Sequence, residues 1–227
     1  MEKLQPLQSD SPLIVYMDLK SPYAYMALEP TYQLEDDYGI EIDWRPLTLD
    51  IPSFLGSARL DDKGRVKESK RSAEQWTNVR YAYRDTKRTA RHRDIILRGT
   101  VKIWDSSLAH IGLLWAKAHD RAALKSYFFN VYERFWRREL DIEDVAVIES
   151  MLEGAGAPVP GFREFSNGEG RALHDSLQDS LHPAGLFGVP SYVLDGQIFF
   201  GREHLPAVRW CLDGRKGCAP DVAYGVW

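Results

Sequence analysis

A strand, a helix and a second strand follow one another in residues 13–47. Residues 13–19 (LIVYMDL) form a short apolar run rich in branched side chains, which is typical of a buried strand. Residues 40–47 (IEIDWRPL) alternate in polarity and end at a proline, which indicates a second strand. With the segment between them helical, the three elements form a βαβ unit whose two strands run parallel.

The helix of this unit has clear start and stop signals. Ser21 is a favoured N-cap residue, and Pro22 is favoured at the first helical position. Gly39 is a typical C-terminal stop, so we predict a helix from Ser21 to Tyr38. Pro30 lies inside this helix and is expected to kink it.

The middle of the chain has a different pattern from its two ends. Residues 50–183 contain no segment that we interpret as a strand, and five stretches there have helical patterns: 70–98, 105–118, 121–138, 142–153 and 169–181. Strands return as a hairpin, residues 191–194 and 197–200, because Asp195-Gly196 between two short apolar runs is a strong hairpin signal. A closing helix is predicted over residues 203–212.

Composition and charge exclude several classes of partner. The net charge of −4 does not favour nucleic acid, and no apolar run is long enough to cross a bilayer. Residues 1–11 are polar and have no apolar signal core, so we expect a cytoplasmic protein. We expect its partner to be a small-molecule substrate. Cys211 and Cys218 form no C-x-x-C pair, and no His and Cys cluster has zinc spacing, so neither a disulfide framework nor a metal site is predicted.

Two motifs narrow the fold. The first is Asp18-x-x-Ser21-Pro22-Tyr23-Ala24-Tyr25, at the end of the first strand. The second is Gly188-Val189-Pro190-Ser191, followed by Val193-Leu194-Asp195-Gly196-x-x-Phe199-Phe200-Gly201. With Trp44-Arg45-Pro46 and Tyr83-x-Asp85-x-x-Arg88-x-Ala90, they resemble the 2-hydroxychromene-2-carboxylate isomerase family. That family is a branch of the DsbA-like proteins, close to the kappa-class glutathione transferases, and residues 100–165 match it only in being helical.

The order of elements and this resemblance predict an α/β thioredoxin fold with a large all-helical insertion. The predicted thioredoxin-like domain is discontinuous, residues 12–49 and 184–213, with the helical insertion at 50–183 and a C-terminal extension at 214–227. The resemblance also implies an isomerase of aromatic degradation, and relatives are often dimers, so a homodimer is expected.

The resemblance implies that glutathione is the cofactor. Ser21 would hydrogen-bond the glutathione sulfur and hold it as thiolate, and a cis bond would precede Pro190 so that the Val189 backbone pairs with the glutathione cysteine. The glutathione contacts that it implies are at three places in the sequence: Ser21, Pro22 and Tyr23; Val189 and Pro190; and Gly201, Arg202 and Glu203.

The chemistry of Ser21 follows from its residue type and place. A hydroxyl cannot exchange disulfides, because that step needs a thiolate, and Ala24 at the second position of the usual C-x-x-C is inert. A helix N-terminus nevertheless favours an anion, and a hydroxyl there can stabilise a bound thiolate by a charge-assisted hydrogen bond. From Ser21-Pro22 alone, a simple N-cap is the alternative interpretation.

One segment departs from the family. A small Ser-Asp pair usually follows the glycine equivalent to Gly201 and holds the γ-glutamyl end of glutathione, whereas this chain has Arg202 and Glu203. Backbone N–H groups there could still bind a carboxylate, and Glu203 could meet the γ-glutamyl amine. The departure leaves room for a different thiol.

Charge is uneven along the chain. Residues 63–102 hold 13 Lys and Arg but only four Asp and Glu. Arg80, Arg84, Lys87 and Arg91 are spaced to share one face of a helix. This face is either a solvated surface or a wall that attracts an acidic substrate or the glutathione carboxylates, and RNA binding is a third interpretation.

Three functions remain open. We predict glutathione-dependent isomerisation of an unsaturated aromatic carboxylate or related enone, with substrate contacts at Arg84, Arg88 and Trp44. Glutathione transfer to an electrophile would use the same site. It would leave a stable conjugate, whereas isomerisation ends with elimination of the thiol from the product. A thioredoxin-like binding module without catalysis is the alternative of a different class. The six histidines are scattered with no ligand spacing, and His204, near the proposed site, is the one most worth following.

Overall fold

The computed structural model describes residues 4–61 and 63–223, in two compact units. The first unit combines Met1–Leu47 with Asp175–Trp227, and the second is Thr48–His174. The first boundary between the units, at Leu47 and Thr48, lies close to the predicted start of the helical insertion at residue 50. The second falls inside helix α8 (Glu169–Leu181), earlier than the predicted bound at residue 183.

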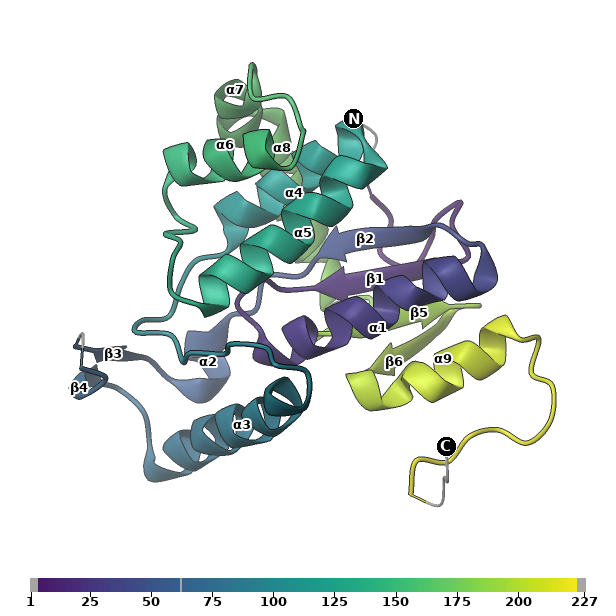
Figure 1. Ribbon diagram of the computed structural model, residues 1–227, viewed down its shortest axis with the longest axis horizontal. Helices are drawn as coiled ribbons and strands as arrows, with labels where there is room; N and C mark the ends of the chain where they lie inside the picture. Colours follow the sequence, from purple (N-terminus) through teal and green to yellow (C-terminus); the bar gives the residue numbers. More distant parts are fainter. Residues whose placement is uncertain (1–3, 62, 224–227) are drawn as a thin grey trace. The chain divides into compact units, whose positions relative to one another are not determined.

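The first unit contains a four-stranded mixed sheet with the order β2-β1-β5-β6 (Figure 1). Its strands are β1 (Leu13–Met17), β2 (Ile42–Pro46), β5 (Ser191–Leu194) and β6 (Gln197–Phe200). β1 is parallel to β2 and antiparallel to β5, which is antiparallel to β6. All residues of β1, β2 and β5 are buried, which agrees with the apolar runs that predicted β1 and β5. β2 was predicted from alternating polarity, and its two charged residues, Asp43 and Arg45, are buried as an ion pair.

Helix α1 (Pro22–Tyr38) connects the two parallel strands as predicted. The Ser21 side chain caps its start, and Gly39 ends it with φ of 61°, a left-handed conformation that glycine adopts without steric cost. The 3₁₀ turn η1 (Arg202–His204) and helix α9 (Leu205–Leu212) follow β6, and both pack against α1. The DsbA-like α/β arrangement predicted from the sequence is therefore present.

The second unit is mainly helical, as predicted. Besides the first residues of α8, its helices are α2 (Ile51–Leu55), α3 (Ala73–His92), α4 (Ser107–His119), α5 (Arg121–Trp136), α6 (Val145–Gly154) and α7 (Phe162–Asn167). Helix α4 packs against α5, α6 and α7, and α5 packs against α6. No helix among the described residues is both long and apolar enough to span a membrane.

Two features of the second unit differ from the prediction. A short antiparallel hairpin, β3 (Ala58–Leu60) with β4 (Val66–Ser69), interrupts the segment predicted to hold no strand. Its residues are exposed or half-buried, so the apolar alternation that identifies a strand is weak there. Helix α3 is also shorter than predicted at both ends: a capping box of Ser72 and Gln75 sets its start, and it ends at His92, before Asp94 with φ of 52°.

Candidate functional site

The strand register of the first unit places the three predicted glutathione-binding segments at one end of the sheet. Ser191 pairs with Tyr16, so β5 begins where β1 ends and the chain turns into α1. Ser191 also pairs with Phe200, and the Gly201 backbone nitrogen donates to the Pro190 carbonyl over 2.9 Å. The start of α1, the segment before β5 and the segment after β6 therefore share this end of the sheet.

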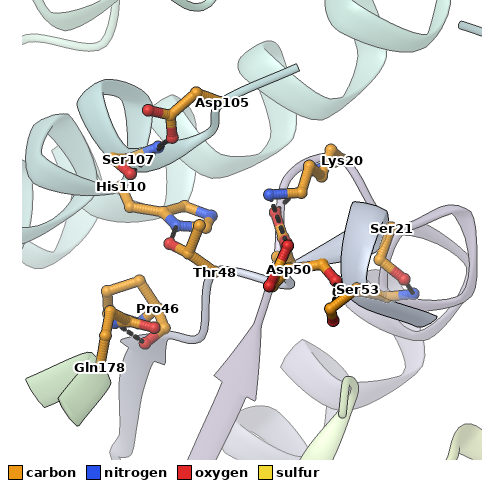
Figure 2. Close-up of polar contacts among 12 residues, drawn as sticks. Lys20, Ser21, Pro46, Thr48, Asp50, Ser53, Asp105, Ser107, His110 and Gln178 are labelled. Carbon is orange, nitrogen blue, oxygen red and sulfur yellow. Dashed lines mark hydrogen bonds and ion pairs between the residues drawn. The ribbon is translucent and has the colours of Figure 1, made fainter. Parts of the chain in front are cut away.

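Ser21 lies at the start of α1 and is 5% exposed. Its Oγ accepts a hydrogen bond from the Ala24 backbone nitrogen over 3.3 Å, as Figure 2 shows. No acceptor for the hydroxyl proton is found within residues 4–61 and 63–223. The hydroxyl thus caps the helix as an acceptor and keeps its proton for another partner.

A tight turn holds Ser21 in place. The Ser21 backbone nitrogen donates to the Asp18 carbonyl over 2.9 Å, which joins the end of β1 to the start of α1. The Asp18 carboxylate is fully buried, accepts from the Lys20 backbone nitrogen over 3.0 Å and lies 3.4 Å from the Lys20 ammonium. Because a buried carboxylate needs such partners, this pair keeps the negative charge of Asp18 neutralised beside the helix start.

The Val189–Pro190 bond is cis, as the resemblance implied. Pro190 accepts from Gly201, and the Gly188 carbonyl accepts from the Ser191 hydroxyl over 2.7 Å. Among the described residues, no hydrogen-bond partner is found for the backbone N–H and C=O of Val189. These two groups have the donor and acceptor needed to pair with an extended peptide.

Gly201 has φ of 103° and directly precedes η1 as its N-cap residue. A Cβ at this position would lie 2.4 Å from the Glu203 carboxylate, which folds back over the glycine. Glu203 is exposed, and its carboxylate makes no hydrogen bond or ion pair with the part of the chain that the structure describes. It is therefore an uncompensated negative charge at the same end of the sheet as Ser21.

The structure corrects the expectation that Trp44 contacts substrate. Its side chain is fully buried in β2, where it stacks on Tyr32 with ring centroids 4.3 Å apart. The indole nitrogen donates to Glu35, which also accepts from the Ile42 backbone nitrogen. With no exposed surface left, Trp44 packs the sheet against α1.

The two predicted substrate-binding arginines of α3 have different surroundings. Arg84 lines a cavity of about 480 Å³ inside the second unit. Arg88 is an ion-paired surface residue, 3.3 Å from the Asp85 carboxylate, and it does not line that cavity. Arg84 is therefore part of a cavity wall, and Arg88 is part of an ordinary charged surface.

Sequence reasoning did not find a cluster of two buried histidines in the second unit. Thr48 Oγ1 lies 2.7 Å from His110 Nδ1, as Figure 2 shows, and 2.9 Å from His174 Nε2. One hydroxyl proton can serve only one ring nitrogen, so Thr48 must accept from the other ring if both imidazoles are neutral. The residues are 62 and 126 positions from Thr48, and no spacing rule connects them.

We expect Thr48→Val to lower the free energy of unfolding by about 1–3 kcal/mol, because two buried ring nitrogens lose their shared partner. Thr48→Ser keeps the hydroxyl and is the matched control. Urea denaturation of both variants measures the effect. Equal stability of the valine variant and the wild type would contradict a structural role for this hydroxyl.

Within the described ranges, no three His, Cys, Asp or Glu side chains gather closely enough to hold a metal ion.

Comparison with known proteins identifies the relatives of this chain. A family model described as a DsbA-like thioredoxin domain matches residues 12–212. A curated 2-hydroxychromene-2-carboxylate isomerase from Sphingobium xenophagum is 26% identical over 191 residues, covering 84% of this chain and 92% of that protein.

Solved structures show the same fold. A 2-hydroxychromene-2-carboxylate isomerase superposes with a TM-score of 0.65 at 20% identity, covering 89% of this chain and 94% of the other. The cytosolic disulfide reductase DsbM from Pseudomonas aeruginosa, solved with GSH, has a TM-score of 0.53 at 17% identity, with coverage of 87% and 91%.

Proposed function

The chain belongs to the DsbA-like thioredoxin family, and from this premise we propose that it is a glutathione-dependent cis–trans isomerase. The substrate would be an unsaturated aromatic carboxylate or a related enone. The curated relative is named as an isomerase of an aromatic carboxylate, which supports an enzymatic role. Disulfide exchange is not proposed, because Ser21 and Ala24 stand where a redox relative needs its two cysteines.

The observation on which the proposal rests is the hydroxyl of Ser21. It lies at a helix N-terminus, is nearly buried, and has a proton without an acceptor among the described residues. A hydrogen bond from this proton to a thiolate is charge-assisted, and the helix dipole also favours negative charge at this point. Both effects lower the pKa of a bound thiol, so Ser21 holds it as thiolate at neutral pH.

Two further groups fit a thiol tripeptide. The N–H and C=O of Val189, for which the described part of the chain offers no partner, would pair with the backbone of the glutathione cysteine. The Glu203 carboxylate would attract the γ-glutamyl ammonium group, replacing the acid that the family usually has nearby. Pro22, Tyr23, Pro190, Gly201 and Arg202 complete the proposed surroundings of the cofactor.

When bound, glutathione supplies a thiolate that adds reversibly to a conjugated double bond, so that the former double bond can rotate as a single bond. The chain's own part is to keep the sulfur ionised at Ser21. A substrate contact at Arg84 stays a prediction from the sequence, and Arg88 is the weaker candidate because it is already paired with Asp85.

Product analysis tests the proposal. We expect that a cis enone carboxylate incubated with the protein and glutathione is converted to its trans isomer, with all glutathione recovered as free thiol. A stable glutathione conjugate instead of the isomer would identify a transferase. No thiol-dependent turnover and no glutathione binding by calorimetry would favour the non-catalytic module, and Arg202 and Glu203 would then be the first residues to examine.

A further inference from the structure

A second site lies in the other unit, in the cavity of about 480 Å³ against α3. The hairpin β3–β4 and the segment around residues 99–103 supply its other walls. This volume is within the range of small-molecule pockets. Every described lining residue belongs to Thr48–His174, so the second unit alone forms this cavity.

Positive charge is concentrated on this cavity. Its cationic lining residues are Arg71, Arg80, Arg84, Lys87, Lys102 and Arg138, and its described lining contains no acidic residue. On α3, the spacing of Arg80, Arg84 and Lys87 at i, i+4 and i+7 places the three on one face. A cavity lined by charge of one sign raises the local concentration of ligands of the opposite sign.

Three of these cations have no counter-charge within residues 4–61 and 63–223. Arg80, Arg84 and Lys87 make no ion pair and no hydrogen bond with any residue that the structure describes. The others have partners: Lys102 pairs with Glu143, and Arg138 donates to the Gly99 carbonyl over 2.6 Å. Repulsion among the three uncompensated charges is relieved most effectively by a ligand with more than one negative charge.

Flat aromatic side chains form the apolar part of the wall. Trp76 has its indole nitrogen bonded to Ser69, and the Arg71 guanidinium lies over its ring at 4.9 Å. The Tyr83 hydroxyl lies 3.2 Å from the Thr100 hydroxyl and accepts from the Thr100 backbone nitrogen, which holds the tyrosine ring in place. Burial lowers the pKa of Arg71, which reflects a guanidinium partly removed from water.

We infer that this cavity binds a small flat-ring ligand with at least two negative charges. Arg80, Arg84 and Lys87 bind the anionic groups, and Trp76 and Tyr83 contact the ring. Two sources share this chemistry, an aromatic dicarboxylate and the phosphate of a nucleotide. The inference does not depend on glutathione or on Ser21, because all of its residues lie in the second unit.

Calorimetry without glutathione tests it, with phthalate and AMP as dianionic ring probes and benzoate as the monoanionic control. We expect phthalate or AMP to bind at least ~10-fold more tightly than benzoate, and the tighter of the two identifies carboxylate or phosphate as the source. No binding of either dianion at millimolar concentration would overturn the inference.

Two arginines of the same helix provide a matched pair. Arg84→Ala removes an uncompensated cation from the cavity wall. We expect it to lower the affinity for the tighter-binding of the two dianionic probes by ~10-fold. Arg88→Ala removes the same charge one turn away, from a surface pair with Asp85, and we expect no change. Equal weakening by both variants would show only the general positive field of α3 and would contradict a defined site.

A third variant tests the ring contact. Trp76→Leu is expected to weaken the binding of phthalate and to leave the binding of inorganic phosphate unchanged, because phosphate has no ring to stack on the indole. Equal effects on both probes would contradict the role of Trp76. Since glutathione binding is measured separately at Ser21, failure of this site and failure of the proposed function are distinguishable.

Discussion

Ser21→Ala is expected to lower kcat of the glutathione-dependent isomerisation by about 100-fold, the usual cost of removing one preorganised donor to a reacting anion. The variant loses the hydroxyl whose proton has no acceptor in the described parts of the chain. Without that proton, the bound thiol ionises at higher pH. Titration of the thiolate by its ultraviolet absorbance should therefore show a raised pKa for protein-bound glutathione.

Controls must separate this effect from helix capping, because Ser21→Ala also removes the acceptor for the Ala24 N–H and costs about 1 kcal/mol of stability. Ser21→Thr keeps both cap and hydroxyl, and it should retain most of the activity. Ser21→Asp keeps the cap but adds a negative charge, so we expect a stable protein that does not bind glutathione. If the alanine variant keeps its activity and the thiol pKa is unchanged, Ser21 is only an N-cap.

Trp44→Ala is expected to lower the free energy of unfolding by about 3–5 kcal/mol, the range for deleting a large buried aromatic side chain. Trp44 has no exposed surface, stacks on Tyr32 and donates to Glu35. Its removal leaves a cavity between β2 and α1, in the unit that holds Ser21. Urea denaturation followed by far-ultraviolet circular dichroism measures the loss.

Trp44→Phe distinguishes packing from substrate binding. Phenylalanine keeps a stacked ring and loses the indole N–H, while Glu35 keeps the Ile42 backbone nitrogen as donor. We expect a stability loss of less than about 1.5 kcal/mol. We also expect an unchanged KM, since the ring does not contact substrate. A raised KM at unchanged stability would restore the substrate role that the sequence suggested.

Most elements could be predicted because their signals are local. Asp195 and Gly196 have φ of 49° and 73°, the conformation of a tight hairpin turn, and β5 and β6 have the predicted bounds. Helix α8 also has the predicted bounds, and α1 lies between Ser21 and Gly39 as predicted. The hairpin β3–β4 was missed because its exposed strands bury no apolar face.

Residue-level roles were harder to predict than elements. Arg84 and Arg88 were both predicted to contact substrate, and the position of Asp85 and the cavity wall now separates them. Trp44 belongs to a family-like motif, yet burial excludes it from the substrate surface. Thr48, His110 and His174 meet through contacts 62 and 126 residues apart, which local patterns do not encode.

From the amino-acid sequence come the βαβ start, the closing hairpin, the helical middle and the hydroxyl in place of a redox thiol, because each depends on residue type and short-range spacing. The tertiary structure alone decides which charges are paired, which hydroxyl protons lack an acceptor and which rings are buried. These properties depend on neighbours distant in the chain. In this protein they distinguish Ser21, whose hydroxyl proton has no acceptor among the described residues, from Trp44, which is part of the core. They also distinguish Arg84, which lines a cavity, from Arg88, which is paired on the surface.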